Sequence, residues 1–487
     1  MVEKISYPEP HDVFVEKSSF RKYLKYFLFF GPGAIVASLT IGQGQLIIGP
    51  QIGAWAGYSL LWLITLNIGS YIIAYVSFRF TMLSGIGIMD LFAIKTHKSW
   101  LNWVFIIIMM IFIPIFTATI MTSLGQALNW IFGFGHYLIW GVSFCLIGAL
   151  IVLIGRFKFF EITHSIFIIF LAAGAIVSVL TVIIANNINF WEIIPNFFTI
   201  GQNVPKEFPM WVSDNYSSVT KTSIPLYMLA YLGTLAITII TTIGYLGWIK
   251  VKKWGIFKDK KDAEIFSQKC FENFKKEGKI TYLPEQPIEL KKSRFLLKPV
   301  KIDLLLAFII VSIVSAAYMI AGYVLLGNNE VLPSDTKLVQ NQLIIFTYLS
   351  DWLKPLFQIS VVFALFGTVY AGFEAATRML YETSKNFSKK IKDVEYKRFM
   401  LYILLYILAT SVPLAIKMAI DPNFSVLTFL SITLLFIGVI GVIIYGIGVI
   451  ILSQTVLPEK YKLGSVGLIL SIIAVIFMSI PFIFLFI

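Results

Sequence analysis

Charge is what this sequence has least of. Only 13% of its 487 residues are charged, whereas 58% are hydrophobic and 16% are aromatic. A soluble globular chain carries about 25% charged residues, and half that share leaves too little polar surface to face water. The composition therefore excludes a soluble enzyme, and its apolar content excludes a disordered chain. What remains is a protein that crosses a membrane several times.

Residues that build common reaction centres are also scarce, with two cysteines and four histidines in the whole chain. Cys145 lies in an apolar run and Cys270 in a polar segment, so a disulfide between them is not expected. The sequence has neither a Cys/His cluster with zinc spacing nor a Walker A motif. We therefore expect no cofactor, no metal centre of that kind, no ATP-driven pump and no enzyme.

Long apolar runs are abundant. A helix needs ~20 apolar residues to cross the hydrocarbon core, and these runs are too long for the strands of a membrane barrel. The predicted fold class is an all-α integral membrane protein with about eleven transmembrane helices. The predicted spans are 27–57, 58–83, 100–124, 136–155, 161–185, 223–249, 299–326, 355–382, 399–419, 424–452 and 463–486.

The basic residues predict the orientation of these spans, because Lys and Arg concentrate in cytosolic loops. The chain has 39 Lys and Arg against 26 Asp and Glu, a net charge of +13. With the N-terminus in the cytosol, 34 basic residues fall on cytosolic segments and 5 on external ones. We therefore predict a cytosolic N-terminus and an external C-terminus, in the plasma membrane of a prokaryote. The basic excess is an orientation signal, and nucleic acid is not an expected partner.

Three segments lie outside the predicted spans. Residues 1–26 form a cytosolic segment without the apolar stretch of a signal peptide. The external loop 186–222 is interpreted as a surface loop with aromatic anchors, or else as a small ordered cap. The cytosolic loop 250–298 contains a short amphipathic helix with Phe266, Cys270 and Phe274 on its apolar face. That face either lies on the anionic lipids of the inner leaflet or packs on neighbouring loops.

Two spans have polar interruptions that carry no charge. The first, in span 1, contains Thr40, Gly42, Gln43, Gly44 and Gln45. Glycine lets the backbone unwind, and unwound backbone at this depth is tolerated where it lines a cavity. Close helix packing through small residues is the alternative.

The second interruption, in span 6, contains Thr238, Thr241 and Thr242, although threonines in membrane helices usually bond to their own backbone. Spans 1 and 6 are equivalent members of two five-helix halves. Paired breaks at equivalent positions predict a midplane binding site in an inverted-repeat transporter. In span 8, Glu374 and Arg378 share one helix face, as a structural ion pair or as a gating or coupling pair.

These residues resemble the Nramp family of metal-ion transporters, whose fold is of the LeuT type. Gly31-Pro32-Gly33 stands before Gly42-Gln43-Gly44-Gln45 as the family's Gly-Pro-Gly stands before its Asp-Pro-Gly-Asn. Gly155 to Glu161 and Phe366 to Glu374 are similar to the family's approach to span 5 and to its span 8. The resemblance implies two five-helix repeats, at 27–185 and 223–456, followed by an eleventh helix at 457–487.

The departures from the family bear on the substrate. The family's metal-binding Asp falls on Gly42 and its Asn on Gln45, while its Met-Pro-His stretch is replaced by Thr238 to Gly244. Soft divalent cations need carboxylate, imidazole or thioether ligands. In this fold the half-helices after both breaks should point their positive N-termini at the cavity.

We therefore expect a secondary transporter of a small inorganic anion such as bicarbonate. A divalent-cation transporter (Mn²⁺, Fe²⁺ or Mg²⁺) with an atypical neutral site and a non-transporting sensor on the same scaffold are the alternatives. The coupling ion and the oligomeric state stay open.

Overall fold

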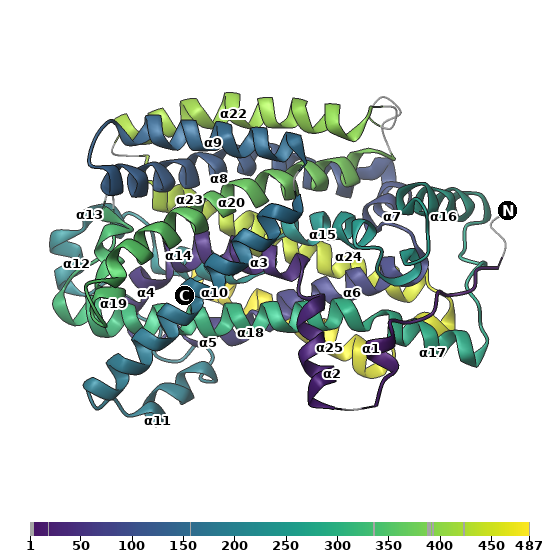
Figure 1. The fold of residues 1–487 in the computed structure, drawn as a ribbon, viewed down its shortest axis with the longest axis horizontal. Helices are drawn as coiled ribbons and strands as arrows, with labels where there is room; N and C mark the ends of the chain where they lie inside the picture. The colour runs from purple at the N-terminus through teal and green to yellow at the C-terminus, as the bar shows by residue number, and fades with distance from the viewer. Residues whose placement is uncertain are drawn as a thin grey trace.

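The chain folds into a bundle whose long helices lie alongside one another (Figure 1). The computed structural model describes residues 4–17, 19–155, 157–334, 337–386, 391, 394–421 and 424–486, with the backbone alone at 43, 157–168, 170 and 171. Across these residues, nine helices are long and apolar enough to cross a membrane, or up to eleven if each of two bent pairs is one span. The predicted all-α membrane class is confirmed.

The first five predicted spans each coincide with helical structure. Span 1 is divided into α3 (Pro32–Thr40), the π-helical η2 (Ile41–Gln45) and α4 (Gly49–Ala56). Span 2 comprises α5 (Trp62–Leu66) and α6 (Ile68–Ser84). Spans 3 to 5 are α8 (Trp100–Phe132), α9 (Tyr137–Ile154) and α10 (Phe157–Ala185).

The remaining six predicted spans also coincide with helical structure. Span 6 is divided into α14 (Ile224–Leu235) and α15 (Ile239–Val251). Spans 7 to 9 are α18 (Lys298–Ala321) with the π-helical η6 (Gly322–Leu326), α20 (Leu353–Ser384) and α22 (Tyr396–Ile420). Span 10 comprises α23 (Val426–Leu434), the π-helical η10 (Leu435–Ile440) and α24 (Gly441–Thr455), and span 11 is α25 (Ser465–Ser479) with η12 (Ile480–Leu485).

Short helices gather at the two ends of the bundle (Figure 1). One end carries the N-terminus, α1 (Asp12–Val15), α2 (Phe20–Lys25), η1 (Tyr26–Phe29), α7 (Ile88–Lys95), α16 (Ala263–Glu277) and α17 (Pro287–Leu296). We call it the basic end, because it includes the lysine-rich segment 250–298. The other carries α11 (Phe190–Ile193), η4 (Ile194–Phe197), α12 (Met210–Asn215), α13 (Ser217–Thr220), η9 (Gln340–Leu343) and α19 (Ile344–Thr347).

The two chain ends lie at opposite ends of the bundle. Phe484, close to the C-terminus, contacts Trp62 with a ring separation of 6.1 Å and lies against Gly201 of the loop 186–222. Tyr7, near the N-terminus, donates a hydrogen bond to the carbonyl of Leu83 at the basic end. An odd number of crossings places the termini in this way. Which end faces the cytosol stays a prediction.

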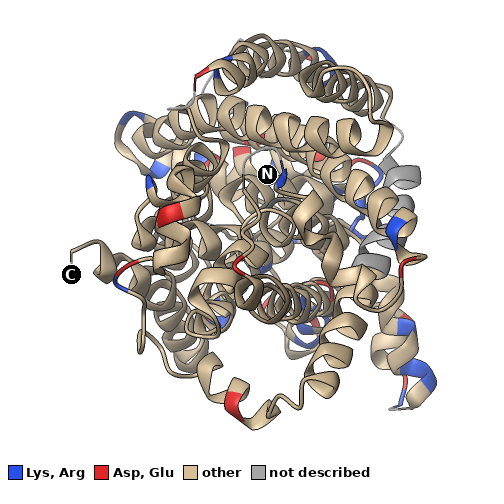
Figure 2. Cartoon of the chain, turned by 90° about the vertical axis from the view of Figure 1, so that its left-hand side faces the viewer, with Lys and Arg blue, Asp and Glu red and all other residues tan. Residues whose placement is uncertain are grey.

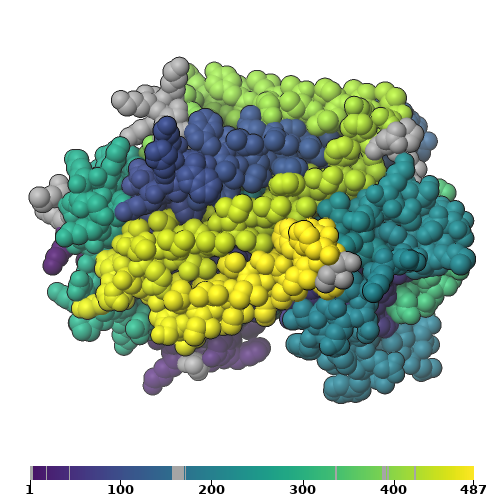
Figure 3. Space-filling view, turned by 180° about the vertical axis from the view of Figure 1, so that it is seen from behind, coloured from purple at the N-terminus to yellow at the C-terminus, as the bar shows by residue number. Residues whose placement is uncertain are grey.

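The broken spans occupy the centre of the bundle. In the helical segment Ile224–Phe257, 94% of the most apolar stretch is buried. The same share is 28% for α9 and 22% for α25 together with η12. A helix that is apolar on every side and buried must be surrounded by other helices. α3 and α4 pack on α18, and α3 also packs on α10 and α20, whereas α25 lies on the surface (Figure 3). Charged residues are few among those that are coloured in Figure 2.

The segment 250–298 packs on the protein. In α16, Cys270 and Phe274 are buried and Phe266 is half-buried, while the ring of Phe266 lies 6.1 Å from that of Phe257. The structure therefore shows the packing alternative for this amphipathic helix rather than the lipid-facing one. The loop 186–222 forms short helices and is tied to the bundle by the Thr65 hydroxyl, which donates to the carbonyl of Phe197 at 2.7 Å.

Candidate functional site

The break in span 1 is a widened helical turn followed by a short connection. α3 continues into the π-helical η2 and then into the turn Leu46–Ile48 before α4 begins. A π-turn leaves backbone groups without their usual partners, and such turns are frequent at functional sites. Here the side chain of Gln342 supplies one partner, because its amide nitrogen donates to the carbonyl of Leu46 at 2.8 Å. No pattern in the sequence predicts this contact.

The break in span 6 is a short extended segment. α14 ends at Leu235, and Ala236 and Thr238 have extended backbone before α15 begins. The Thr238 hydroxyl caps α15 by accepting from the N–H of Thr241 at 3.4 Å. The N–H groups of Ile239 and Ile240 in the first turn have no acceptor among the described residues. The start of α15 therefore carries a partial positive charge and free donors.

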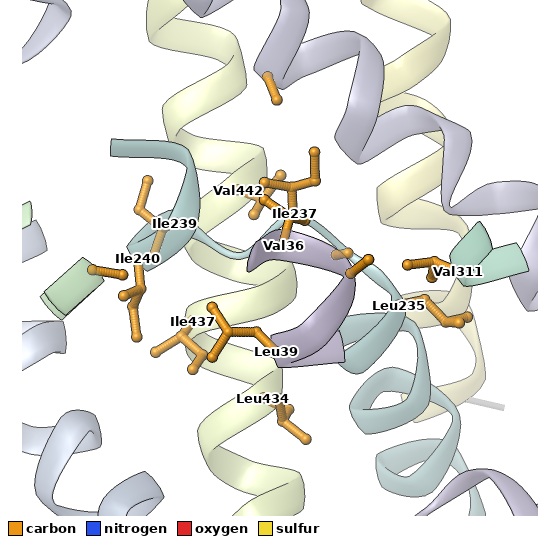
Figure 4. Packing of buried hydrophobic residues seen from close by; sticks show 14 of the residues in the cluster. Val36, Leu39, Leu235, Ile237, Ile239, Ile240, Val311, Leu434, Ile437 and Val442 are labelled. Carbon is orange, nitrogen blue, oxygen red and sulfur yellow. The ribbon is translucent and has the colours of Figure 1, made fainter. Parts of the chain in front are cut away.

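A small cavity lies between the end of α3 and the start of α15, enclosed by α8, α20 and η10. Its volume is about 30 Å³, which is room for one or two water molecules. Most of its lining is apolar, and Leu39, Ile240 and Ile437 meet on one side of it (Figure 4). Its polar lining consists of the hydroxyls of Thr40, Thr117, Thr238, Thr241 and Thr368. None of the described residues that line this cavity is charged.

The structure brings three of the predicted site residues to this cavity, namely Thr40, Thr238 and Thr241. Gly42, Gly44, Gln45 and Thr242 do not line it, and the side chain of Gln43 lies outside the described residues.

The glycines of η2 serve close packing. A methyl group added at Gly42 would lie 2.0 Å from the hydroxyl oxygen of Thr368, and one at Gly44 would lie 2.6 Å from that of Thr234. The structure thus shows for both glycines the helix-packing alternative rather than a direct place in the cavity wall.

Gln45 and Thr242 lie outside the lining of the cavity. Gln45 is fully buried, its side-chain oxygen accepts from the Tyr231 hydroxyl at 3.4 Å, and its amide nitrogen has no partner among the described residues. Thr242 donates to the carbonyl of Ile237 at 3.2 Å. We expected the half-helices after both breaks to point their N-termini at the cavity. In the structure α15 does so, whereas α4 begins at Gly49, outside the lining.

Sequence reasoning missed Thr117 and Thr368, which come from spans 3 and 8. Each is a single threonine in a long apolar helix, and such a residue is indistinguishable by sequence from one that bonds to its own backbone. In the structure, Thr368 does make that bond, to the carbonyl of Ala364 at 3.0 Å.

Asp303 was also missed, although an acidic residue inside the predicted span 299–326 was a usable signal. Its carboxylate is fully buried and accepts from the N–H of Gly31 at 2.8 Å and from that of Gly33 at 2.7 Å. The Tyr245 hydroxyl of α15 donates to the same carboxylate. Asp303 therefore joins the start of α3 to α15 and α18 at the basic end of the bundle.

A network of ion pairs closes the same end, in which Lys250, Glu382 and Lys385 are buried and Glu264 is half-exposed. The Lys250 ammonium lies 2.9 Å from a Glu264 oxygen and 3.1 Å from a Glu382 oxygen, and Lys385 lies 2.7 Å from Glu382. Burial acts to raise the pKa of Glu264, but Lys250 and Lys385 outweigh it and hold that pKa well below its ordinary value. Charges buried in this way are tolerated because each one is paired. The network links α15, α16 and α20.

Glu374 and Arg378 form the predicted ion pair, with the guanidinium Nη2 2.8 Å from the carboxylate. The pair lines a second cavity of about 270 Å³ at the basic end, between α9, α15, α20 and α22. Lys252 and Lys397 line it too, so that the described residues contribute three cationic side chains and one carboxylate to this cavity. Val369 of α20 lines the first cavity and Tyr370 lines the second. We call the second cavity the basic vestibule.

Comparison of the structure with solved structures identifies the fold. A mutant of the manganese transporter of Eremococcus coleocola aligns over 99% of this chain and 89% of its own, with a TM-score of 0.60 at 13% identity. The same transporter in complex with an aromatic bis-isothiourea compound gives 0.59 at 14% identity, over 99% and 90% of the two chains. The chain has a LeuT-type transporter fold.

MhsT in complex with L-phenylalanine matches this LeuT-type fold at a TM-score of 0.51 and 15% identity, over 93% of this chain and 97% of its own. No protein-family model and no curated protein matches the sequence. The fold that the Nramp resemblance implies is therefore confirmed, and with it a multi-pass integral membrane protein. Among the described residues, no group of three or more His, Cys, Asp and Glu could hold a metal ion.

Proposed function

We propose that this LeuT-type chain is a secondary transporter that moves a small inorganic anion through the threonine-lined cavity by alternating access. Bicarbonate is one candidate, because it is small and can make several hydrogen bonds. The observation that carries the proposal is a cavity that faces the start of α15 and has no charged residue among its described lining residues. A helix N-terminus favours an anion, and a neutral lining leaves that field unopposed.

The basic vestibule supports the same substrate class. Among the described residues, Lys252, Arg378 and Lys397 line it together with one carboxylate, that of Glu374. A cleft lined by one sign of charge concentrates ions of the opposite sign. An anion that leaves the cavity along α20 thus meets an attractive surface, with the Glu374–Arg378 pair at the boundary between the two cavities. We assign this pair a gating role.

The cavity must enlarge during transport, because about 30 Å³ holds only one or two waters. Transporters of this fold class work by rocking one helix group against another around the central site. The hydroxyls of Thr40 and Thr117 make no hydrogen bond within the described part of the chain, so both are free to bond to a substrate oxygen.

Uptake of labelled bicarbonate into proteoliposomes tests the proposal directly. Thr40→Val keeps the shape of the side chain and removes a cavity-lining hydroxyl that makes no hydrogen bond within the described part of the chain, so it should lower uptake about tenfold, the equivalent of one lost charge-assisted hydrogen bond. Thr347→Val is the matched control, since Thr347 donates to its own helix at Leu343 and lies outside the cavity. Flat uptake across a panel of small anions would overturn the proposal.

Divalent-cation transport is the second candidate, since the solved structures of the same fold include a manganese transporter. It requires a neutral site to hold a dication. Calorimetric titration separates the two candidates. Micromolar Mn²⁺ binding that weakens in Gln45→Ala, the residue at the position of the family's metal-binding Asn, would favour the cation.

A further inference from the structure

A third cavity, of about 590 Å³, lies at the basic end and away from the substrate path. It is enclosed by α6, α17, the start of α18 and the turn between spans 10 and 11. Its lining holds one carboxylate, that of Glu459, and six cationic side chains, namely Arg79, Arg294, Lys298, Lys301, Lys460 and Lys462. Two of these cations are paired within the chain, Lys460 with Glu285 at 3.1 Å and Lys462 with Glu459 at 2.6 Å, and the other four make no ion pair with a described carboxylate.

Several of these cations lack an internal partner. Within the described residues, the side chains of Arg294 and Lys301 make no hydrogen bond or ion pair, and both are exposed. Arg79 is held in place because its Nη2 donates to the carbonyls of Tyr461 at 2.7 Å and Lys462 at 3.1 Å. Its Nη1 is buried without any partner. A buried donor without an acceptor costs free energy that an anionic oxygen would recover.

The cavity adjoins the apolar surface of the bundle. On α18, Lys301 is followed one turn later by Leu305, whose side chain is 55% exposed. On α25, which follows the cavity residue Gly464, Val466 and Ile469 are 72% and 56% exposed. Exposed apolar side chains on a membrane protein face lipid, so the cavity lies where the acyl region meets the headgroups. In Figure 3, α25 is exposed along the face of the molecule.

We propose that this cavity binds the phosphate headgroup of an anionic membrane lipid, with Arg294 and Lys301 as its exposed cations and Arg79 as the one held in place by the backbone. The acyl chains would lie along the exposed apolar residues of α18 and α25. Basic pockets between membrane helices recognise anionic headgroups in this way. An inorganic phosphate ion has the same charged oxygens but gains nothing from the apolar surface beside the cavity. The adjoining apolar surface is why we assign a lipid.

Melting temperatures of the full-length protein in delipidated detergent solution test this proposal. We expect phosphatidylglycerol to raise the melting temperature more than phosphatidylcholine does, because a ligand that binds the folded state stabilises it. The double variant Arg294→Gln/Lys301→Gln should weaken the apparent affinity for phosphatidylglycerol about tenfold or more, since each basic group near an anionic lipid contributes ~1 kcal/mol. Both residues are exposed, so the fold should tolerate the change.

The control is Lys275→Gln/Lys276→Gln, which removes two exposed lysines of α16 that lie outside the cavity. It should bind phosphatidylglycerol like the parent protein. Equal losses in both double variants, or no loss in the first, would overturn the proposal. It would be overturned too if millimolar inorganic phosphate stabilised the parent as much as the lipid does. None of these outcomes depends on transport of any substrate.

Discussion

The contact between Asp303 and the start of α3 makes a strong prediction. The buried carboxylate accepts from the N–H groups of Gly31 and Gly33 and from the Tyr245 hydroxyl. These bonds hold the start of α3 against α15 and α18 at the basic end. In Asp303→Asn the charge is lost, and the new amide nitrogen faces groups that are themselves donors.

The size of the effect follows from these bonds. Losing a charge-assisted hydrogen bond and leaving one buried N–H without an acceptor costs ~2–4 kcal/mol. If the start of α3 moves away from α18, water hydrates the same N–H groups. The substitution therefore destabilises only the arrangement in which α3 packs on α18, which we call the closed state. The population with α3 open should therefore rise by roughly 30-fold to several hundredfold, because 1.4 kcal/mol corresponds to a factor of ten.

Cysteine accessibility measures that population. Ser38 on α3 is buried, so Ser38→Cys in a background without Cys145 and Cys270 should react slowly with a maleimide. Adding Asp303→Asn should speed the labelling by the factor given above. Asp259→Asn, which removes an exposed carboxylate in the segment 250–298, should leave the rate unchanged. Equal rates with and without Asp303→Asn would refute the role of this carboxylate.

Three further predictions concern packing and burial. Gly42→Ala should abolish uptake or lower the melting temperature by several degrees, because its methyl group would meet Thr368 at 2.0 Å. Gly464→Ala, which meets nothing within 4 Å, should leave both unchanged. Gln342→Ala removes the donor that satisfies the break in span 1 and should cost ~1–3 kcal/mol in a denaturation assay. Burial raises the pKa of the Cys270 thiol to about 11. Cys270 should therefore resist maleimide at pH 7 in the folded protein and react after denaturation. Rapid labelling of the folded protein would contradict the burial of this face of α16.

The sequence by itself determined the all-α membrane class and located apolar runs that coincide with helices. A membrane helix must satisfy its own backbone within one apolar run, so each span is a local property that can be found without its neighbours. The breaks in spans 1 and 6 were found for the same reason, since Gly42 to Gln45 and Thr238 to Thr242 interrupt the runs in which they lie.

Only the tertiary structure decided which polar side chains meet. Thr117 and Thr368 reach the cavity because the rotation of α8 and α20 places those positions on the faces that line it. A single hydroxyl in an otherwise apolar helix does not indicate which face that will be. The same holds for Gly42, which packs on α20. Arg79 and Arg294 are more than two hundred positions apart in the chain and line one cavity. Contacts between distant segments depend on helix rotation and depth, which apolar periodicity leaves undetermined when a helix is apolar on every side.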